Sequence, residues 1–323
     1  MISGKQETGP FTRKEIPPHL QPGPQDSLVT GISAILVSQG WLMEANLPGT
    51  MEQSDPEYLH QMRVATRRLR FTLRLFQRIL ITRERARMVD SLRWIASLLG
   101  DVRDDDVLIM ELSRWMEDID IPEDSQNLVF REIVRDRDRH ILPLKTALTS
   151  PRLRALLKKL VSIRPESSLF RRSGLAAAPL IDAAPLFILK KSKRVRRWLD
   201  RTPDSFSPDE LHRLRIDFKG LRYTCEFFSS FYPKSFSKHI SRFVAYQDCL
   251  GAHQDARVAG NRIRSIAERL SSGDENAIEA TLHLGRLLRH LEQVAQNQRK
   301  MFAEMWPSFP KQFSRFRSLV KRF

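Results

Sequence analysis

Hydrophobic residues recur every three to four positions along most of the chain, the spacing of one face of an α-helix. Runs that alternate with a period of two between Asn-Gly or Asp-Gly turns are absent. In the first half, this pattern predicts helices at 26–46, 56–80, 83–100, 103–117, 123–149 and 151–163. In the second half, it predicts helices at 179–201, 208–230, 234–250, 254–272, 275–304 and 310–321. The sequence therefore predicts an all-α protein.

The two halves share two motifs at an offset of about 152 residues. His60–Arg70 and His212–Arg222 both follow the pattern H-x-x-R-[VI]-x-x-[RK]-x-L-R, and Leu99–Asp104 similarly matches Leu250–Asp255. Two motifs at nearly one offset predict an internal duplication, with two tandem helical bundles related by a pseudo-two-fold axis. The expected organisation is a flexible N-terminal segment at 1–25, a first bundle at 26–163, a linker at 164–178 and a second bundle at 179–323.

Each copy of the longer motif is expected early in a helix. Asp55-Pro56 and the capping box that begins at Ser207 are helix start signals. At 100° per residue, one stripe of the first helix collects His60, Arg63, Arg67, Arg70, Arg74 and Arg78. The second helix repeats this stripe with His212, Arg215, Lys219 and Arg222, then departs from it at Glu226. Apolar residues occupy the opposite side of the first helix, which is its expected core face.

The charge of the chain indicates an anionic partner. Lysine and arginine total 54 against 38 acidic residues, a net charge of +16, and 40 of the 54 are arginines, whose planar guanidinium binds phosphate bidentately. A basic stripe can be a solvated helix face, but such faces usually interleave acids with bases. No acid occurs from Tyr58 to Arg83, and the stripe occurs twice. Cations about 5–6 Å apart along a helix favour a linear polyanion over a single phosphate.

A second basic run precedes the second motif and would lie beside it in an antiparallel hairpin, although such a run can also serve solubility alone. The candidate polyanion-binding residues are His60, Arg63, Arg67, Arg70, Arg74, His212, Arg215, Lys219, Arg222, Lys190, Lys193, Arg194 and Arg197. The histidines are expected to donate to phosphate, since a polyanion favours the doubly protonated ring. A buried hydrogen-bonding role is the alternative for each histidine.

Other chemistry has little support in the sequence. The aspartates at 101 and 104–106 could hold Mg²⁺, but helix capping or pairing with the stripe is favoured for Asp104 and its counterpart Asp255. Cys225 and Cys249 form no metal-spaced cluster, and no nucleotide-binding loop, metalloprotease motif or nucleophile–base pair is present. We therefore expect no enzyme activity, no metal and no cofactor. The uncharged stretch 27–43 is expected to be a buried helix rather than a membrane span, and without a signal peptide the protein is expected to be cytoplasmic.

These motifs resemble the CHAD family, the conserved histidine α-helical domain. The resemblance rests on residues 60–71, 98–107, 212–226 and 247–258, and it runs from about residue 26 to the C-terminus. It implies two helical bundles that bind inorganic polyphosphate on a basic surface or central channel. The leading hypothesis is therefore a polyphosphate-binding module that acts in targeting or as a scaffold at polyphosphate granules. The E-x-E-x-K motif of the CYTH triphosphatase domain, often fused to CHAD domains, is absent. Non-specific nucleic-acid binding is the main alternative, and an all-α Mg-dependent phosphohydrolase is a weaker one.

Overall fold

The structure is a computed structural model that describes residues 9–270 and 275–322. Over these ranges the chain is built from α-helices and short 3₁₀ turns and contains no β-strand, only isolated bridges at Leu80–Phe170 and Ser27–Pro179. The predicted all-α class is therefore confirmed. The first eight residues of the predicted N-terminal segment and the predicted helix end at 271–272 lie outside the described residues.

The chain forms two compact units. The first comprises Met1–Val107 and Val134–Leu180, and the second comprises Leu108–Ile133 and Ile181–Phe323. Residues 108–133, which the sequence analysis places in the first bundle, thus belong to the compact unit of the second half. The cause is a long helical hairpin whose far end packs against second-half helices.

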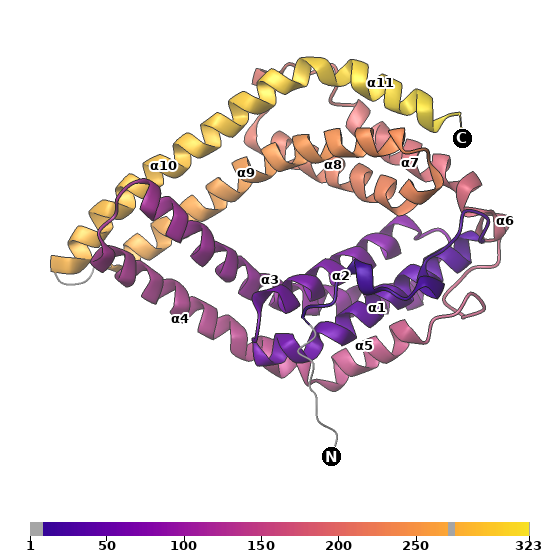
Figure 1. The fold of residues 1–323 in the computed structure, drawn as a ribbon, viewed down its shortest axis with the longest axis horizontal. Coiled ribbons are helices and arrows are strands. Elements are labelled where there is room, and N and C mark those ends of the chain that lie inside the picture. Colours follow the sequence, from indigo (N-terminus) through magenta and orange to yellow (C-terminus); the bar gives the residue numbers. More distant parts are fainter. Residues whose placement is uncertain (1–8, 271–274, 323) are drawn as a thin grey trace. The chain divides into compact units, whose positions relative to one another are not determined.

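The helices of the first half are coloured indigo to magenta in Figure 1. They are α1 (Leu28–Glu52), α2 (Pro56–Leu75), α3 (Thr82–Asp118), α4 (Glu123–Leu148), α5 (Pro151–Val161) and the short α6 (Gly174–Ala177). The predicted N-cap of α2 is present: the Asp55 side chain accepts a hydrogen bond from the Glu57 amide at the start of the helix. Helix α2 ends at Leu75, so Arg78 does not continue the stripe as predicted; it lies in the turn that follows.

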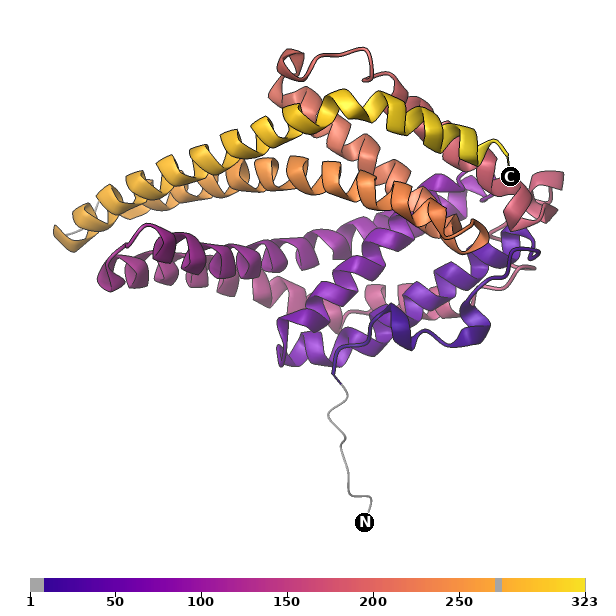
Figure 2. The ribbon, with the colours of Figure 1, turned by 45° about the horizontal axis from the view of Figure 1, so that its top comes forward.

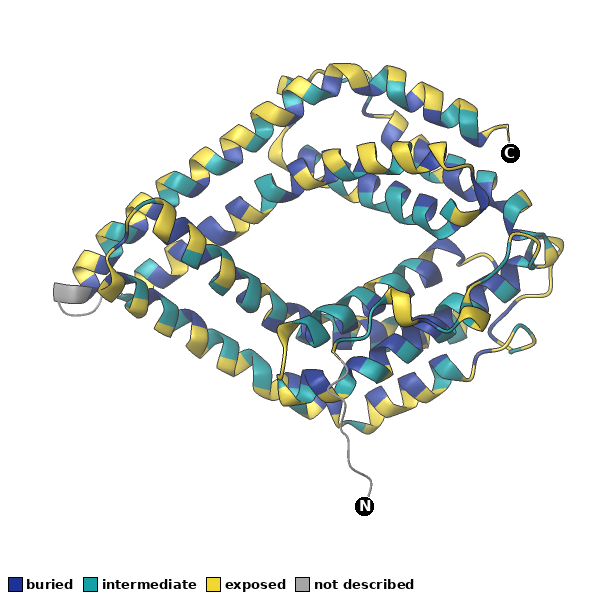
Figure 3. Cartoon of the chain, in the orientation of Figure 1, coloured by how far each residue is buried: buried dark blue, intermediate teal, exposed yellow. Residues whose placement is uncertain are grey.

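Helix α1 is the core helix of the first unit and packs against α2 and α5. Two glycines allow this approach, because a Cβ at Gly40 would lie 2.7 Å from Leu160 and a Cβ at Gly49 would lie 2.4 Å from the Tyr58 ring. Of the described helices, α1 is the one long and apolar enough to cross a membrane by length and composition. Its most apolar stretch is 56% buried inside the protein, as expected for a core helix (Figure 3).

The segments predicted as an N-terminal lead-in and a linker are packed against the first unit where the structure describes them. The backbone of Phe11 exchanges two hydrogen bonds with the buried Asn46 side chain, of 3.0 and 2.9 Å. In the linker, Phe170 is buried, and Arg171 donates through its amide to the Ile79 carbonyl at 2.7 Å. Both segments therefore extend the first unit.

The second half is coloured from magenta-pink through orange to yellow in Figure 1. Its helices are α7 (Leu180–Arg196), α8 (Pro208–Phe228), α9 (Ser235–Leu270), α10 (Glu275–Met305) and α11 (Phe309–Val320). Figure 2 shows α9 and α10 running side by side as a long hairpin. An aromatic core joins α8, α9 and α11, with the rings of Phe218 and Tyr246 stacked at 5.5 Å and Phe309 packed edge-on to both.

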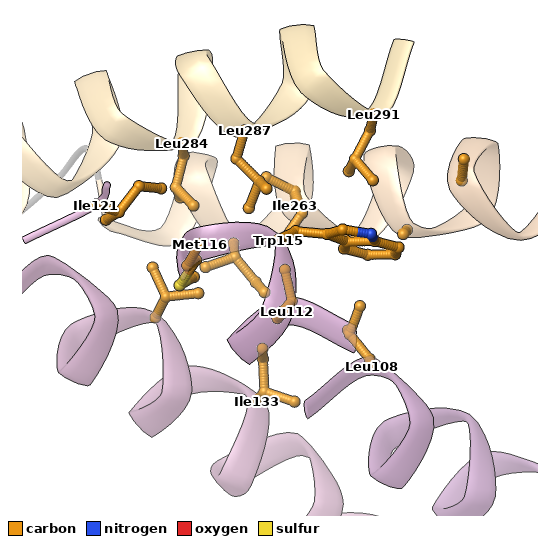
Figure 4. Close-up of a cluster of buried hydrophobic side chains, with 14 of the residues drawn as sticks. Leu108, Leu112, Trp115, Met116, Ile121, Ile133, Ile263, Leu284, Leu287 and Leu291 are labelled. Atoms are coloured by element: carbon orange, nitrogen blue, oxygen red, sulfur yellow. The ribbon is translucent and has the colours of Figure 1, made fainter. Parts of the chain in front are cut away.

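The far ends of α3 and α4 pack against α9 and α10 in one apolar cluster (Figure 4). Leu112, Ile133, Ile263 and Leu287 each contribute a side chain that is fully buried. A buried leucine of this kind stabilises a fold by about 2–5 kcal/mol relative to alanine. This four-helix cluster explains why residues 108–133 belong to the second unit.

The predicted helix breaks near Gly100 and Gly251 are wrong. Helix α3 is continuous from Thr82 to Asp118, and α9 is continuous from Ser235 to Leu270. A glycine inside a helix costs only about 1 kcal/mol relative to alanine, which favourable packing outweighs. Helices α2 and α3 have 20 and 37 residues, close to the 21 and 36 of α8 and α9, whereas α4 has 26 and α10 has 31. The internal duplication itself stays a prediction.

Candidate functional site

The α2 stripe, defined as His60, Arg63, Arg67, Arg70 and Arg74, lies along one side of α2 as predicted. Arg67 and Arg74 are exposed, whereas the other three side chains are partly buried. Burial lowers the pKa of Arg70, and the neighbouring Arg74 and Arg93 lower it further. The stripe therefore gathers like charges at close range, and a bound anion would reduce the repulsion between them.

Two residues of the shared motif on α3, Gly100 and Asp104, position the side chain of Arg63. Its guanidinium lies 3.2 Å from the Asp104 carboxylate, and a Cβ at Gly100 would lie only 2.7 Å from its Nη1. Gly100 thus makes room for the arginine to cross the helix. Of the two roles considered for Asp104, pairing with the stripe is correct and capping is wrong, because the residue lies inside α3.

The α8 stripe, defined as His212, Arg215, Lys219 and Arg222, repeats this arrangement in the second unit. Arg215 lies 3.3 Å from Asp255, and a Cβ at Gly251 would lie 3.6 Å from the Arg215 guanidinium. At its far end, Arg222 pairs with Glu226 at 3.4 Å and covers the Tyr223 ring. The capping box at Ser207 is present, so His212 lies near the positive end of the helix dipole.

The basic run on α7 has mixed roles. Lys190, Lys193 and Arg194 are exposed on the outer face of α7. Arg197 follows the end of the helix and donates to the buried Asp217 of α8 at 2.8 Å. Lys191 also lies beside α8, with its Cδ 4.0 Å from the position of a Cβ on Gly220.

Lys191 supplies a cation beside Gly220 of α8, and the first half has a cation at the matching position by another route. Gly220 matches Arg68 of α2 in the shared motif. A cation that α2 carries on its own backbone is thus supplied to α8 by the neighbouring helix. The sequence analysis names Lys190 and Lys193 as candidate ligand contacts but not Lys191. Which of these lysines lies beside α8 depends on which face of α7 is packed, and the sequence alone does not give this.

The sequence analysis also did not identify two arginines of α3 that add positive charge near the α2 stripe. The positive charge of Arg103 lowers the pKa of His60, and the positive charge of Arg93 lowers that of Arg70. Burial is the largest cause of the lowered pKa of His60, which Glu57 opposes. The lowered pKa favours the neutral ring of His60 in the unliganded protein, and a bound anion would favour the doubly protonated ring expected from the sequence.

The aspartates at the middle of α3 point to separate partners. Asp105 is fully buried and bonds to Nδ1 of His140 at 2.6 Å, while Asp106 accepts from Arg137 at 2.6 Å. Over the described residues, no group of three or more His, Cys, Asp or Glu side chains could hold a metal ion. Three of the four aspartates considered for Mg²⁺, Asp104, Asp105 and Asp106, thus contact separate partners, which are Arg63, His140 and Arg137.

Comparison with known proteins identifies the family. The sequence matches the CHAD domain over residues 39–264. It is 31% identical over 223 residues to an uncharacterised protein of Mycobacterium tuberculosis in each of two strains, CDC 1551 and H37Rv, a match that covers 68% of this chain and 42% of each relative. The chain thus matches less than half the length of these relatives.

Two solved structures have the same fold. The crystal structure of the CHAD domain from the plant Ricinus communis is similar with a TM-score of 0.68 and 25% identity, covering 86% of this chain and 93% of that one. PptA from Streptomyces chartreusis also gives a TM-score of 0.68, at 18% identity, covering 87% of this chain and 99% of that one. The second likeness concerns the fold alone.

Proposed function

Because this chain belongs to the CHAD domain family, we propose that it binds inorganic polyphosphate through the α2 stripe and the α8 stripe. The observation that carries the proposal is the α2 stripe. Four arginines follow one side of the helix with no acid between Tyr58 and Arg83, and Arg93 and Arg103 add positive charge from α3. A linear polyanion with one charge per repeat matches a linear row of cations.

The ion pairs with Asp104 and Asp255 support this role. Each carboxylate holds one guanidinium in place, and a guanidinium has five donors, so several remain for phosphate oxygens. Holding Arg63 and Arg215 before the ligand arrives lowers the entropic cost of binding. The exposed aspartates, 63% and 71% exposed, act in this proposal as positioning residues.

Binding of polyphosphate would also define the role of this protein in the cell. We expect a targeting or scaffold protein at polyphosphate granules in the cytoplasm, with the α7 cations Lys190, Lys193 and Arg194 extending the contact. A fluorescent fusion should co-localise with granules and become diffuse when the α2 arginines are replaced. We expect no phosphate release from polyphosphate, with or without Mg²⁺; release that requires Mg²⁺ would favour a phosphohydrolase.

A competition titration tests the binding proposal. Labelled polyphosphate is displaced by unlabelled polyphosphate, duplex DNA or single-stranded RNA at matched phosphate concentration. Polyphosphate should compete best, and its binding should weaken steeply with salt. If each contact contributes a slope of about −0.7, as for single-stranded nucleic acid, eight contacts give roughly −5 to −6. Equal competition by all three polymers would identify a general polyanion binder, and a slope shallower than about −2 would contradict joint action of the two stripes.

A further inference from the structure

A hollow of about 270 Å³ lies between the first turns of α8 and the middle of α9, inside the second unit. His212 of α8 and three α9 side chains, Gln254, Arg257 and Asn261, line it with hydrogen-bond donors. Asp209 is the one carboxylate among the described residues that line it. A concave site with several convergent polar groups is the usual form of a small-ligand site.

The donors of this hollow are available to a ligand. Within the described part of the chain, the side chains of His212, Gln254 and Arg257 have no hydrogen-bond partner. The carbonyl of Asn261 accepts a hydrogen bond of 3.0 Å from Arg264, which leaves the Asn261 amide N–H groups to donate. One guanidinium, one imidazole and two carboxamides therefore surround a small space, and Asp209 is the one carboxylate among the described residues that line it.

This donor set fits the end of a phosphate chain better than its middle. A terminal phosphoryl group has three non-bridging oxygens and a charge that approaches −2 near neutral pH, like a phosphate monoester. An internal residue of the chain has two such oxygens and one charge. Four donor side chains in one hollow match the larger number of acceptors.

The position of the hollow agrees with this assignment. His212 belongs both to the hollow and to the α8 stripe, of which it is the first residue. From there Arg215, Lys219 and Arg222 follow along α8, and the stripe stops at Glu226, about 21 Å away at 1.5 Å per residue. A chain that begins in the hollow would continue along the stripe.

The first half lacks this donor set. In the shared alignment the places of Gln254, Arg257 and Asn261 on α9 are taken on α3 by Arg103, Asp106 and Met110. Asp106 is occupied by Arg137, and Met110 is an apolar side chain that is 59% exposed. Among the residues that the structure describes, this set of donor side chains is therefore particular to the second half.

We propose that the α8–α9 hollow binds the terminal phosphoryl group of a polyphosphate chain, so that the α8 stripe receives chains by their ends. The inference rests on the proposed function and adds a preference for chain ends to it. The chemistry it recognises, a phosphoryl dianion, is shared by free inorganic phosphate, which the test below distinguishes.

The experiment compares polyphosphate of one chain length in two forms. In the capped form each terminal phosphoryl group is converted to an alkyl phosphoramidate, which leaves it a single negative charge. The wild-type chain should bind uncapped polyphosphate about tenfold more tightly than the capped form, a difference of about 1.4 kcal/mol. The double variant Arg257→Ala/Asn261→Ala should bind both forms with the affinity that the wild type has for the capped form.

The control variant is Arg289→Ala, which removes an equal charge from a side chain 78% exposed on α10. It should keep the tenfold preference, and circular dichroism should show unchanged helix content in both variants. Equal affinity of the wild type for the two forms would overturn the inference while leaving polyphosphate binding intact. Displacement of the uncapped chain by inorganic phosphate as readily as by pyrophosphate would also overturn it, since the hollow would then be a free-phosphate site. Failure of both forms to bind would overturn the proposed function as well.

Discussion

The α2 stripe and the α8 stripe share a motif but differ in charge. Both place an arginine against an aspartate one helix away, Arg63 on Asp104 and Arg215 on Asp255. The α2 stripe then continues to Arg74, whereas the matching position of α8 is Glu226, which pairs with Arg222. The motif thus positions one arginine against an aspartate in each unit. The other residues of each stripe determine its positive charge.

We expect the first unit to contribute most of the electrostatic affinity for the proposed polyphosphate ligand. The α2 stripe has four arginines and receives the charge of Arg93 and Arg103 from α3. The α8 stripe has three cations and is followed by an acid, Glu226, although Lys191 of α7 supplies a further cation on its flank. Neutralised phosphates release counterions, so affinity follows the number of cations that the ligand meets.

The largest predicted effect comes from removing matched pairs of cations. Arg63→Ala with Arg67→Ala should weaken the binding of long polyphosphate by about 3–6 kcal/mol, at ~1.5–3 kcal/mol for each charge-assisted contact. Arg215→Ala with Lys219→Ala should cost less, because Glu226 already weakens that stripe. Titration of both variants with long chains, together with circular dichroism for folding, measures the difference. Equal losses in the two variants would contradict the ranking of the units.

The next largest effect is expected from exchanging the charges of Glu226 and Arg74, the aligned residues that distinguish the two stripes. Glu226→Arg should tighten binding by about tenfold and make the salt slope steeper by roughly 1, since an acid is replaced by a phosphate-binding cation. Arg74→Glu should do the opposite to the α2 stripe. Affinity measured over a series of salt concentrations checks both. A Glu226→Arg variant with unchanged affinity would show that the end of the α8 stripe does not meet the ligand.

The third effect concerns the two glycines of the shared motif. Gly100→Ala should displace the Arg63 guanidinium, since its Cβ would lie 2.7 Å away, and lower affinity about three- to tenfold. Gly251→Ala has ordinary contact distance, 3.6 Å, and should leave affinity unchanged. Neither variant should lose stability, because alanine gains up to about 1 kcal/mol of helix propensity. Polyphosphate titration and thermal unfolding separate the two effects, and an equal loss of affinity in both variants would contradict the steric account.

These glycines also mark the limit of what the sequence predicts. The helix caps, the all-α class and the stripes themselves follow from local patterns, and the structure has them. Gly100 and Gly251 indicate helix breaks by local rules, yet each lies inside a continuous helix. Gly100 gives space to Arg63 of another helix, whereas Gly251 lies at ordinary contact distance from Arg215. Their role depends on a contact between distant segments, which no local propensity encodes.

The same reason explains the other errors of the sequence analysis. Arg78 follows the 3.6-residue period of α2, but the helix ends at Leu75 and the chain turns so that Ile79 and Leu80 are buried. Arg197 stays a predicted ligand contact, with 56% of its side chain exposed, and the fold adds a partner that the sequence did not predict, the buried Asp217. Arg93 and Arg103 become part of the site only through the packing of α3. Periodicity places a residue on a helix face; tertiary contacts decide what that face meets.

The smallest predicted effect is a pH dependence carried by His60. Burial and nearby arginines lower the pKa of His60 in the free protein, whereas a polyphosphate oxygen beside the ring would raise it. A group whose pKa rises on binding takes up a proton, so affinity should increase as the pH falls from the bound pKa towards the free pKa and become constant below that. Between about pH 7.5 and 5.5, where carboxylates stay ionised, we expect a gain of a few-fold beyond that of His60→Gln. The matched variant His212→Gln should keep the His60 contribution. Titrations of the wild type and both variants across this range measure it, and an identical pH profile for the wild type and His60→Gln would show that this ring does not bind the ligand.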